Sequence, residues 1–429
     1  MSKAQDARNL ALSSTEASVL DYVVQHRDEL LQLLSDLIAI PTPNPPGDDY
    51  KAFCDFTADW LRAAGLEVKV MAAAEESLAD MLRPEAEGQR YAVLACLKGT
   101  GGHPTLCLQG HYDTVPASGD WEIDPYDPQV VDGKLYGLGS TDMKGGLACM
   151  MMAAKALAHE KVPLRGDLYF LTTPDEEFPS GAGLAYFLDH GIVEADFAVV
   201  GEPSGIDNIH IGMKGGIWGD IVVHGKAVHG SRPFEGVNAF EKMVSVASAI
   251  QARLYPLLAE RTSKFDFHPA QGNHPTLTLG GLVSGTNASR ATVPDTCRVS
   301  FDRRLIPEED LDEAEAELVS FLKGLEKEDR DLSLEIRLSS RAPAMVIPDS
   351  CELVEALSGA IGDLSGAEPT RTVSCGGFET ALFVDRGVQA LTYGPGVEGC
   401  AHAAGEHTLV GDLAFATRVY ALTALRILS

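Results

Sequence analysis

The sequence predicts an α/β protein: a wound, mostly parallel sheet that carries an inserted ferredoxin-like βαββαβ unit. Three observations predict this fold. Apolar runs of strand length alternate with helical periodicity over residues 66–200. Over residues 217–338 the order changes to strand, helix, strand, strand, helix, strand. His, Asp and Glu residues follow several of the apolar runs, which is where an open α/β sheet assembles its site.

The first part of the chain predicts the wound sheet. Apolar residues at helical spacing predict one helix over residues 15–40, which the Pro-rich turn Pro41–Gly47 ends. The elements expected next are helix 50–64, strands 66–71, 91–97 and 105–109, helix 144–160, strand 167–173, helix 183–190 and strand 196–200. This alternation indicates a sheet that is covered by helices.

The middle of the chain predicts the inserted unit. Its expected elements are strand 217–224, helix 237–254, strands 276–281 and 297–304, helix 308–327 and strand 332–338. From Leu353 the chain returns to helix, strand and a final amphipathic helix near residues 411–428. We therefore expect one domain made of residues 1–207 and 341–429, and an inserted domain of residues 208–340.

Composition excludes several classes of partner. Lys and Arg number 34 against 62 Asp and Glu, and the net charge of −28 argues against nucleic acid or an anionic membrane. The eight cysteines show no C-x-x-C spacing, which favours reduced thiols in a cytoplasmic protein. Residues Met1–Asp6 lack the apolar core of a signal peptide, and no apolar run is long enough to predict a membrane span.

Metal-binding side chains follow the strand expected at 105–109. His111 offers one ring nitrogen to a metal, and Asp113 can accept the other ring N–H and fix the tautomer. Asp142 lies in a Gly-bounded loop, and its two oxygens can bridge two metals about 3.5–4 Å apart. Taken alone, Asp142 is better explained as a cap of the helix that begins near Lys144.

Later strands contribute the remaining candidates. Glu176 and Glu177 are adjacent, and in an extended chain one could bind metal while the other faces the attacking water. Glu202 follows the next strand, and either His402 or His407 completes the set, because spacing does not choose between them. Two histidines and three carboxylates with one further glutamate suit a pair of zinc ions.

Taken together, the motifs resemble those of the di-zinc amidohydrolases, the group of acetylornithine deacetylase, succinyl-diaminopimelate desuccinylase, aminoacylase and carboxypeptidase G. The motifs are His111-Tyr-Asp-Thr-Val-Pro, Gly139-Ser-Thr-Asp-Met-Lys-Gly-Gly, Pro174-Asp-Glu-Glu, Gly201-Glu-Pro and Ala401-His-Ala-Ala-Gly-Glu. They occur in the family order, and the resemblance runs from about Glu29 to the C-terminus.

This resemblance implies a role for each matching ligand. His111 and Glu202 would bind one zinc ion, Glu177 and His402 would bind the other, and Asp142 would bridge them. Cobalt is expected to substitute for zinc.

The resemblance also implies the residues that act on the substrate. Glu176 would be the general base, Asp113 would orient His111, and the peptide between Asp142 and Met143 would be cis. The implied reaction is hydrolysis of the amide bond of an N-acyl amino acid, of the acetylornithine deacetylase or succinyl-diaminopimelate desuccinylase type. A dipeptidase or a glutamate-releasing carboxypeptidase with the same site is the alternative. A non-catalytic relative would lack a ligand or the base, and none is missing.

The inserted domain would form a homodimer and act as a lid. His229, in Ala227–Pro233, would enter the partner's active site. Arg304 would bind a substrate carboxylate, because its planar fork matches that group.

Two segments that touch substrate in the family depart from its pattern here. The stretch Ser289–Pro294 carries Arg290 and lacks the usual asparagine, and the loop with Gly376 and Gly377 differs from the usual Gly-Gly-Thr-Asp type.

Overall fold

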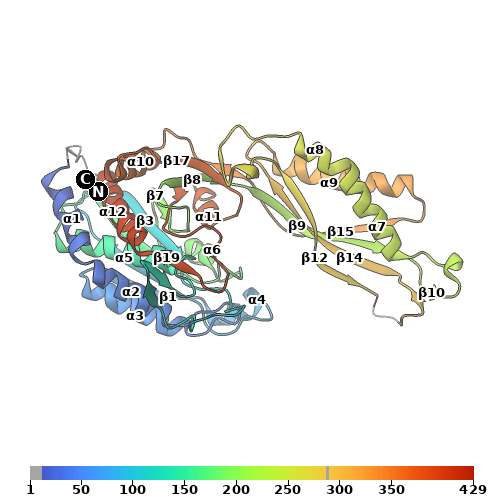
Figure 1. Cartoon of the computed structure of the whole chain (residues 1–429), viewed down its shortest axis with the longest axis horizontal. Helices are drawn as coiled ribbons and strands as arrows, with labels where there is room; N and C mark the ends of the chain where they lie inside the picture. The colour runs from blue at the N-terminus through green and yellow to red at the C-terminus, as the bar shows by residue number, and fades with distance from the viewer. Residues whose placement is uncertain (1–11, 287–288) are drawn as a thin grey trace. The chain divides into compact units, whose positions relative to one another are not determined.

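The computed structural model describes residues 12–286 and 289–429, and it divides into two compact units (Figure 1). The first unit contains the chain up to Ile211, Ile347–Arg371 and Phe378–Ser429, and the second contains Gly212–Val346 and Thr372–Gly377. The expectation for Met1–Asp6 lies outside the described residues. The proposed domain bounds at 207/208 and 340/341 stay a prediction.

A mostly parallel sheet forms the centre of the first unit, which confirms the predicted fold class. Its strands follow the order β1-β2-β6-β3-β7-β18-β8. Their bounds are β1 Glu67–Ala72, β2 Tyr91–Leu97, β3 Gly102–His111, β6 Gly166–Thr173, β7 Phe197–Val200, β8 Asn208–Met213 and β18 Gln389–Thr392. The four central strands β6, β3, β7 and β18 are parallel, and β1, β2 and β8 add antiparallel neighbours.

Helices cover both faces of this sheet. They are α1 Ser14–Gln25, α2 Arg27–Ile38, α3 Tyr50–Ala63, α4 Glu75–Met81, α5 Lys144–His159, α6 Leu184–Asp189, α10 Glu352–Ser365, α11 Thr380–Val384 and α12 Val410–Leu428. Along β3, side chains alternate between the faces: Leu106 and Leu108 lie on one, and Cys107 lies on the other, in a core cluster with residues of α6 and α11. Helices α5 and α12 both pack against β3 and β6.

The prediction of one helix over residues 15–40 is wrong. The chain leaves helical geometry at His26, whose backbone and ring nitrogens both bond to the carbonyl of Tyr22. α2 then starts with two acidic residues in its first turn, Asp28 and Glu29, which suit a helix N-terminus. Apolar periodicity continues across the break, so the pattern alone could not reveal it.

A small antiparallel sheet, which the sequence did not predict, joins distant parts of the first unit. It consists of β4 Gln129–Val131, β5 Lys134–Tyr136 and β19 His407–Leu409, in the order β19-β5-β4. His407 pairs with Tyr136 in its register. The C-terminal segment is therefore bound to the chain that leads into the loop of Asp142.

The second unit contains the predicted split βαββαβ arrangement. Its four-stranded antiparallel sheet has the order β12-β14-β9-β15. The elements between residues 215 and 346 are β9 Gly215–His224, β10 Val228–His229, α7 Ala239–Ala249, α8 Tyr255–Ala259, β11 Phe267–His268, β12 Thr276–Gly285, β13 Thr292–Val293, β14 Thr296–Leu305, α9 Leu311–Glu328, β15 Ser333–Ala342 and β16 Met345–Val346. Strand β17 Thr370–Ser374 begins in the first unit and ends in the second. The expected helix 237–254 ends earlier, at Ala249, and a π-helical turn follows it. Pro256 lies just beyond this turn and has no backbone N–H to donate to a regular α-helix.

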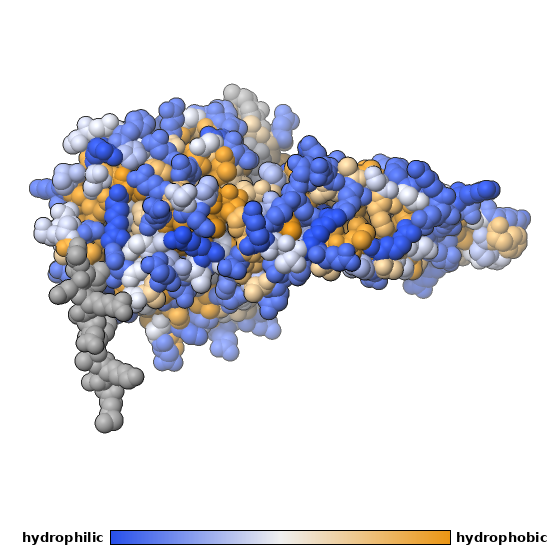
Figure 2. Space-filling model, turned by 90° about the horizontal axis from the view of Figure 1, so that it is seen from above, coloured by the Kyte–Doolittle hydropathy of each residue, from blue (hydrophilic) through white to orange (hydrophobic). Residues whose placement is uncertain are grey.

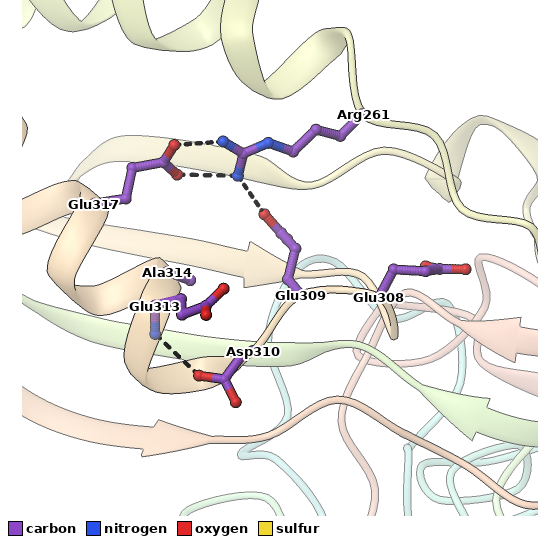
Figure 3. A pocket seen from close by; sticks show the side chains of 7 residues that line it. All are labelled: Arg261, Glu308, Glu309, Asp310, Glu313, Ala314 and Glu317. Atoms are coloured by element: carbon purple, nitrogen blue, oxygen red, sulfur yellow. Dashed lines mark hydrogen bonds and ion pairs between the residues drawn. The ribbon is translucent and has the colours of Figure 1, made fainter.

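Ion pairs hold the loop after α8 to the start of α9. Arg261 Nη1 lies 2.7 Å from Glu309 Oε1 and also donates to Glu317 (Figure 3). The buried residues of this unit, among them Ile221 and Phe301, form a core of their own.

Hydrophilic residues cover most of the surface that is visible in Figure 2. No helix within the described ranges combines the length and apolar character that a membrane crossing requires.

Candidate metal centre

Neighbouring parallel strands bring the candidate ligands to one edge of the sheet. His111 is the last residue of β3 and lies beside Thr173, the last residue of β6. On the other side of β3, Gln109 lies beside Val200, the last residue of β7. The turn with the adjacent glutamates follows β6, and Glu202 follows β7 by two residues. The register of the sheet therefore places three ligand-bearing segments side by side.

Asp142 lies between the two predicted histidine ligands. Its Oδ1 is 3.2 Å from His111 Nε2, and its Oδ2 is 3.3 Å from His402 Nε2. His111 Nε2 also lies 3.3 Å from Glu202 Oε1, and His402 Nε2 lies 2.8 Å from Glu177 Oε2. One carboxylate with an oxygen directed at each imidazole has the arrangement that a metal-bridging ligand needs.

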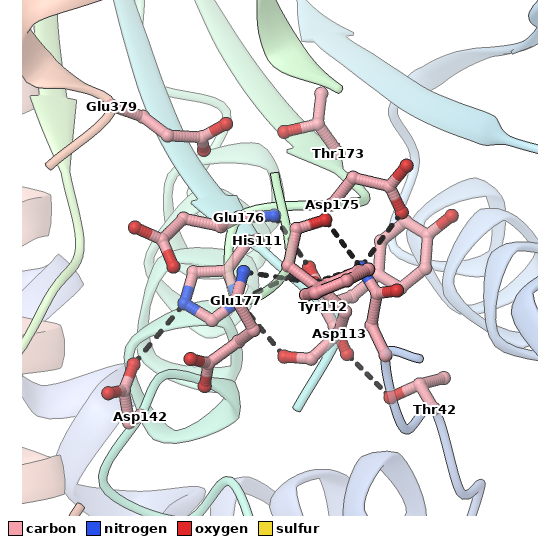
Figure 4. A network of polar contacts seen from close by, with 12 residues as sticks. Thr42, His111, Tyr112, Asp113, Asp142, Thr173, Asp175, Glu176, Glu177 and Glu379 are labelled. Atoms are coloured by element: carbon pink, nitrogen blue, oxygen red, sulfur yellow. Dashed lines mark hydrogen bonds and ion pairs between the residues drawn. The ribbon is translucent and has the colours of Figure 1, made fainter. Parts of the chain in front are cut away.

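Two groups of side chains could each hold a metal ion. One group is His111, Asp142 and Glu177, and the other is His111, Glu176 and Glu202; in each, the ligand atoms lie within 4.8 Å of one another. Figure 4 shows the side chains of Glu176, Glu177 and Asp142 around the His111 ring.

The donor set fits divalent cations. Oε1 of Glu177 is buried and has no hydrogen-bond partner among the described residues. An unpaired buried carboxylate oxygen is costly unless a cation neutralises it. Imidazole nitrogens and carboxylate oxygens are the ligands that zinc takes in catalytic sites.

Burial is the main cause of the raised pKa values of two candidate carboxyl ligands. Burial, followed by the charge of Asp142, raises the pKa of Glu202 to about 8. Burial also raises the pKa of Glu177 above its usual range.

Neighbouring carboxylates raise the pKa of both imidazoles. Hydrogen bonds to Asp142 and Glu177 raise the pKa of His402 to about 10. Burial opposes the charged form of His111, but the charge of Glu202 and hydrogen bonds to Asp113, Asp142 and Glu202 raise the pKa of His111 well above its usual value. A bound cation would have to displace these protons.

Asp113 holds the turn that carries the two glutamates. Its Oδ1 accepts the backbone N–H of Glu176 at 3.2 Å, and its Oδ2 accepts that of Glu177 at 3.1 Å. The expected extended chain is wrong here, because residues 176–179 form a turn after Asp175, which has a left-handed φ of 66°. His111 Nδ1 lies 3.0 Å from the backbone carbonyl of Asp113 and 3.5 Å from its carboxylate. Asp113 therefore contacts His111 mainly through its backbone carbonyl and holds the glutamate turn through its carboxylate.

Sequence reasoning missed the network behind this turn. Arg90 Nε donates to both oxygens of Asp175 at 2.9 Å, and both side chains are fully buried. Asn44 Nδ2 donates to Asp113 Oδ2 and to Asp175 Oδ1, each at 3.0 Å. Asp175 stands within the Pro174-Asp-Glu-Glu motif, and Asn44 stands within the Pro-rich turn Pro41–Gly47. Arg90 belongs to no motif.

Glu379 was also missed. It is buried, and its Oε2 accepts a 2.5 Å hydrogen bond from Nε2 of Gln109, two residues before His111. Figure 4 shows its carboxyl group directed toward the side of the site where Glu176 lies. Burial raises the pKa of Glu379 to about 7. One signal in the sequence could have indicated Glu379: it stands in the loop with Gly376 and Gly377, which departs from the family pattern.

The structure separates two alternatives that spacing left open. His407 lies on β19, where Nδ1 is 3.0 Å from the carbonyl of Gly405 and the ring packs against Tyr136. His402, by contrast, contacts the acidic cluster. Asp142 does not cap α5, whose N-cap residue is Met143, and the Asp142–Met143 peptide is cis as the resemblance implies.

The other predicted site residues lie in the second unit, and their roles stay predictions. His229 is exposed on β10, with Nδ1 at 2.7 Å from Ser231 Oγ. Arg304 pairs with both oxygens of Asp302, at 2.8 and 3.0 Å, and stacks over Trp218.

The predicted substrate loop follows β17. The backbone N–H of Gly376 donates to Ser374 Oγ at 3.0 Å, and Gly377 comes next. Arg290 is exposed in the segment before β13.

A wound sheet that gathers imidazoles and carboxylates at its strand ends, with an inserted βαββαβ unit, has the architecture of a metal-dependent hydrolase. The chain belongs to peptidase family M20/M25/M40, whose sequence model matches residues 107–426. A succinyl-diaminopimelate desuccinylase of Methylobacterium radiotolerans is 29% identical over 402 residues, which cover 92% of this chain and 95% of the relative. An acetylornithine deacetylase of Proteus mirabilis is 30% identical over 398 residues, which cover 90% and 92%. The predicted resemblance and enzyme class are confirmed.

Solved structures share the fold. Human carnosine dipeptidase 1 superposes with a TM-score of 0.76 at 19% identity, covering 97% of this chain and 99% of its own. A Bacillus subtilis protein described as a dinuclear metal binding peptidase from the M20 family gives a TM-score of 0.66 at 15% identity, covering 94% and 99%. At these identities the likeness concerns the fold.

Proposed function

We propose that this chain hydrolyses the amide bond of an N-acyl amino acid, of the acetylornithine or succinyl-diaminopimelate kind. The observation that carries the proposal is the placement of Asp142 between His111 and His402, with one oxygen toward each ring. The names of the relatives at 29% and 30% identity support the acylated amino acid as substrate class.

Two zinc ions are the proposed cofactors, and cobalt is expected to substitute. In this assignment His111 and Glu202 bind one ion, Glu177 and His402 bind the other, and Asp142 bridges them. The unpartnered oxygen of Glu177 supports a cation at its side of the site. When bound, the metal pair would acidify a water molecule and polarise the scissile carbonyl.

Glu176 is the proposed general base. Burial raises the pKa of Glu176 well above its usual range, against the opposing charge of His111, and a carboxylate with a raised pKa is a stronger base. Glu176 takes the proton of the attacking water and delivers it to the leaving amine nitrogen. The products are a carboxylate and a free amine. Asp113 keeps Glu176 in place through its backbone N–H.

A substrate panel tests the proposal. The protein is loaded with zinc or with cobalt and offered acetylornithine, succinyl-diaminopimelate and a set of dipeptides. We expect hydrolysis of an N-acyl amino acid that stops when the metal is chelated and returns when it is restored. Preferential cleavage of dipeptides would establish the dipeptidase or carboxypeptidase alternative. Failure of the metal-loaded protein to cleave any amide would reject the function.

We further propose a cytoplasmic homodimer formed through the second unit, in which His229 acts on the partner's substrate and Arg304 binds a substrate carboxylate. His229 is exposed and belongs to a different unit from the five ligands, which is compatible with action in trans.

In a mixed dimer of a His229→Ala chain and a Glu176→Ala chain, action in trans leaves one site intact. About half of the wild-type activity per dimer should then return, by this count of intact sites. A verified mixed dimer that stays inactive would exclude action in trans.

A further inference from the structure

A buried carboxylate outside the ligand set holds the loop that carries Asp142. Glu406 is 1% exposed, and its Oε1 accepts the backbone N–H groups of Thr141 at 2.9 Å and of Asp142 at 3.0 Å. The backbone N–H of Gly139 donates to the same carboxyl group. Three backbone N–H groups of the loop are thus directed at one side chain.

No described Lys, Arg or His lies within salt-bridge distance of Glu406, although the buried Lys144 interacts with it electrostatically, so backbone N–H groups are its direct partners. Burying a carboxylate is costly, and burial raises the pKa of Glu406 to about 7; the backbone hydrogen bonds to its charged form recover part of that cost. The side chain therefore has a strong preference for a loop conformation in which the N–H groups of Thr141 and Asp142 converge. Loop and carboxylate fix each other.

The segment that contains Glu406 also supplies a ligand. His402, four residues earlier, places Nε2 at 3.3 Å from Asp142 Oδ2. The backbone carbonyl of Glu406 accepts the N–H of Gly137 at 3.0 Å, and Thr141 Oγ1 donates to the carbonyl of His407 at 2.7 Å. One short segment thus binds the Asp142 loop at several points and presents the imidazole that Asp142 faces.

We infer that Glu406 is a positioning residue for the bridging carboxylate of Asp142, and the inference rests on the proposed two-metal function. A hydrogen bond to the N–H of Asp142 restrains its backbone and hence the direction of its Cβ. Asp142 has one oxygen for each imidazole, so a small rotation would spoil its contact with His111 or with His402. Glu406 thereby maintains the geometry that both metals share, without touching either.

The two bonds from Thr141 and Asp142 end on the same oxygen, which gives a sharp test. In Glu406→Gln the amide oxygen can accept both bonds, and only the contact with Gly139 is weakened. In Glu406→Leu, a side chain of similar size, both bonds are lost. The experiment titrates the chelator-treated, full-length protein with Co²⁺. Calorimetry measures the affinity of each equivalent, and visible absorption reports the coordination of the bound metal.

Wild type is expected to bind two equivalents of Co²⁺. We expect Glu406→Leu to bind the second equivalent about 10–100-fold more weakly, the usual effect of removing a residue that orients a metal ligand. The visible spectrum should change with it. Glu406→Gln should stay close to wild type in affinity and spectrum. Thr141→Val is the matched control: it removes the Thr141 hydroxyl bond to His407 and keeps both bonds to Glu406, so the second equivalent should bind as in wild type.

Equal affinity of Glu406→Leu and wild type for both equivalents would overturn the inference, and so would equal losses in Glu406→Gln and Glu406→Leu. If Glu406→Leu does not fold, Glu406→Asp decides. Its carboxylate is too short to reach both N–H groups, and wild-type affinity in that variant would overturn the inference. A wild-type protein that binds no Co²⁺ would instead refute the proposed metal centre itself.

Discussion

Glu176 and Glu177 are neighbours in one turn, yet their surroundings differ. Glu177 Oε2 lies 2.8 Å from His402, whereas Glu176 belongs to the group on the other side, with His111 and Glu202. Both backbones are held by the same carboxylate, that of Asp113. Matched substitutions at the two positions can therefore test which glutamate is the general base and which is the metal ligand.

Replacing Glu176 by Gln should abolish proton transfer and keep the metal. We expect kcat to fall by about 10²–10⁴-fold, the contribution of a general acid–base group. Bound zinc, measured by metal analysis after dialysis, should stay near the wild-type level. Glu177→Gln is the control, because it removes a charged ligand and should lower bound zinc. Loss of zinc in Glu176→Gln, with retention in Glu177→Gln, would reverse the two roles.

Glu379 should make stability depend on pH. Burial raises the pKa of Glu379 from the usual 4.5 to about 7, so the folded protein binds its proton more tightly than the unfolded chain does. The resulting stabilisation is complete below pH 4.5 and is lost as the pH rises through about 7. Glu379→Gln does not titrate, so its stability relative to wild type should increase over this range, by up to roughly 3 kcal/mol.

Urea denaturation of the metal-free proteins at a series of pH values measures this difference. The exposed Glu352 on α10 provides the control, since Glu352→Gln should leave the difference from wild type nearly flat. A flat difference for Glu379→Gln as well would mean that Glu379 titrates alike in the folded and unfolded states.

At the scale of single residues, the sequence marked the candidate ligands, whereas most of the residues that contact them from behind carry no local signal. His111 and Glu202 directly follow apolar runs, and a polar residue at a strand end is visible in the sequence itself. Arg90, Asn44 and Glu379 act through partners 69 to 270 residues away along the chain. Such contacts depend on tertiary packing, which periodicity does not report.

At the scale of secondary structure, long amphipathic elements were predictable and short ones were not. α5 was expected at residues 144–160 and spans Lys144–His159, and β2 agrees with the expected strand 91–97. The three-residue strands β4, β5 and β19 are too short to show a period. They matter nevertheless, because they bind the C-terminal segment beside the Asp142 loop.

The N-terminus of α5 approaches the end of β7 closely enough to require glycine. A Cβ on Gly146 would lie 2.4 Å from the backbone carbonyl oxygen of Gly201, the residue before Glu202. Gly146→Ala should push helix and strand end apart, destabilise the protein by about 1–3 kcal/mol, and weaken metal binding through displacement of Glu202. Urea denaturation and Co²⁺ titration measure the two effects.

Gly324 in α9 provides the control for a helical glycine. A Cβ there would meet nothing within 4 Å, so Gly324→Ala should stabilise the protein by up to about 1 kcal/mol through helix propensity. If Gly146→Ala behaved in the same way, the close approach to Gly201 would have no energetic role.

At the scale of the whole molecule, composition and element order predicted the fold class and the kind of chemistry. The change from alternating to βαββαβ order located the second unit, and the net charge of −28 argued against polyanionic partners. Substrate identity did not follow, because the candidate substrate residues Arg304, Gly376 and Gly377 lie in segments of ordinary composition. Arg304, for example, satisfies its charge with Asp302 two residues away.

All five predicted ligands belong to the first unit, while residues 212–346 have a separate hydrophobic core. A metal that binds the folded site stabilises only the structure that forms it, by about 4 kcal/mol when its free concentration is a thousand times its Kd. Chelation should therefore loosen the first unit selectively. We expect amide hydrogen exchange, followed by mass spectrometry, to accelerate in peptides that cover β3 and β7 when zinc is removed. Peptides from β9 and β14 should exchange at an unchanged rate.

His402→Ala serves as the control for this experiment, because a protein without that ligand should respond much less to zinc or to chelator. Equal acceleration in β3 and β14 on chelation would show that the two cores unfold as one cooperative structure. We expect a selective effect because the buried carboxylates that repel Glu176, such as Asp142 and Glu379, all belong to the first unit. No described residue of the second unit belongs to either candidate metal group.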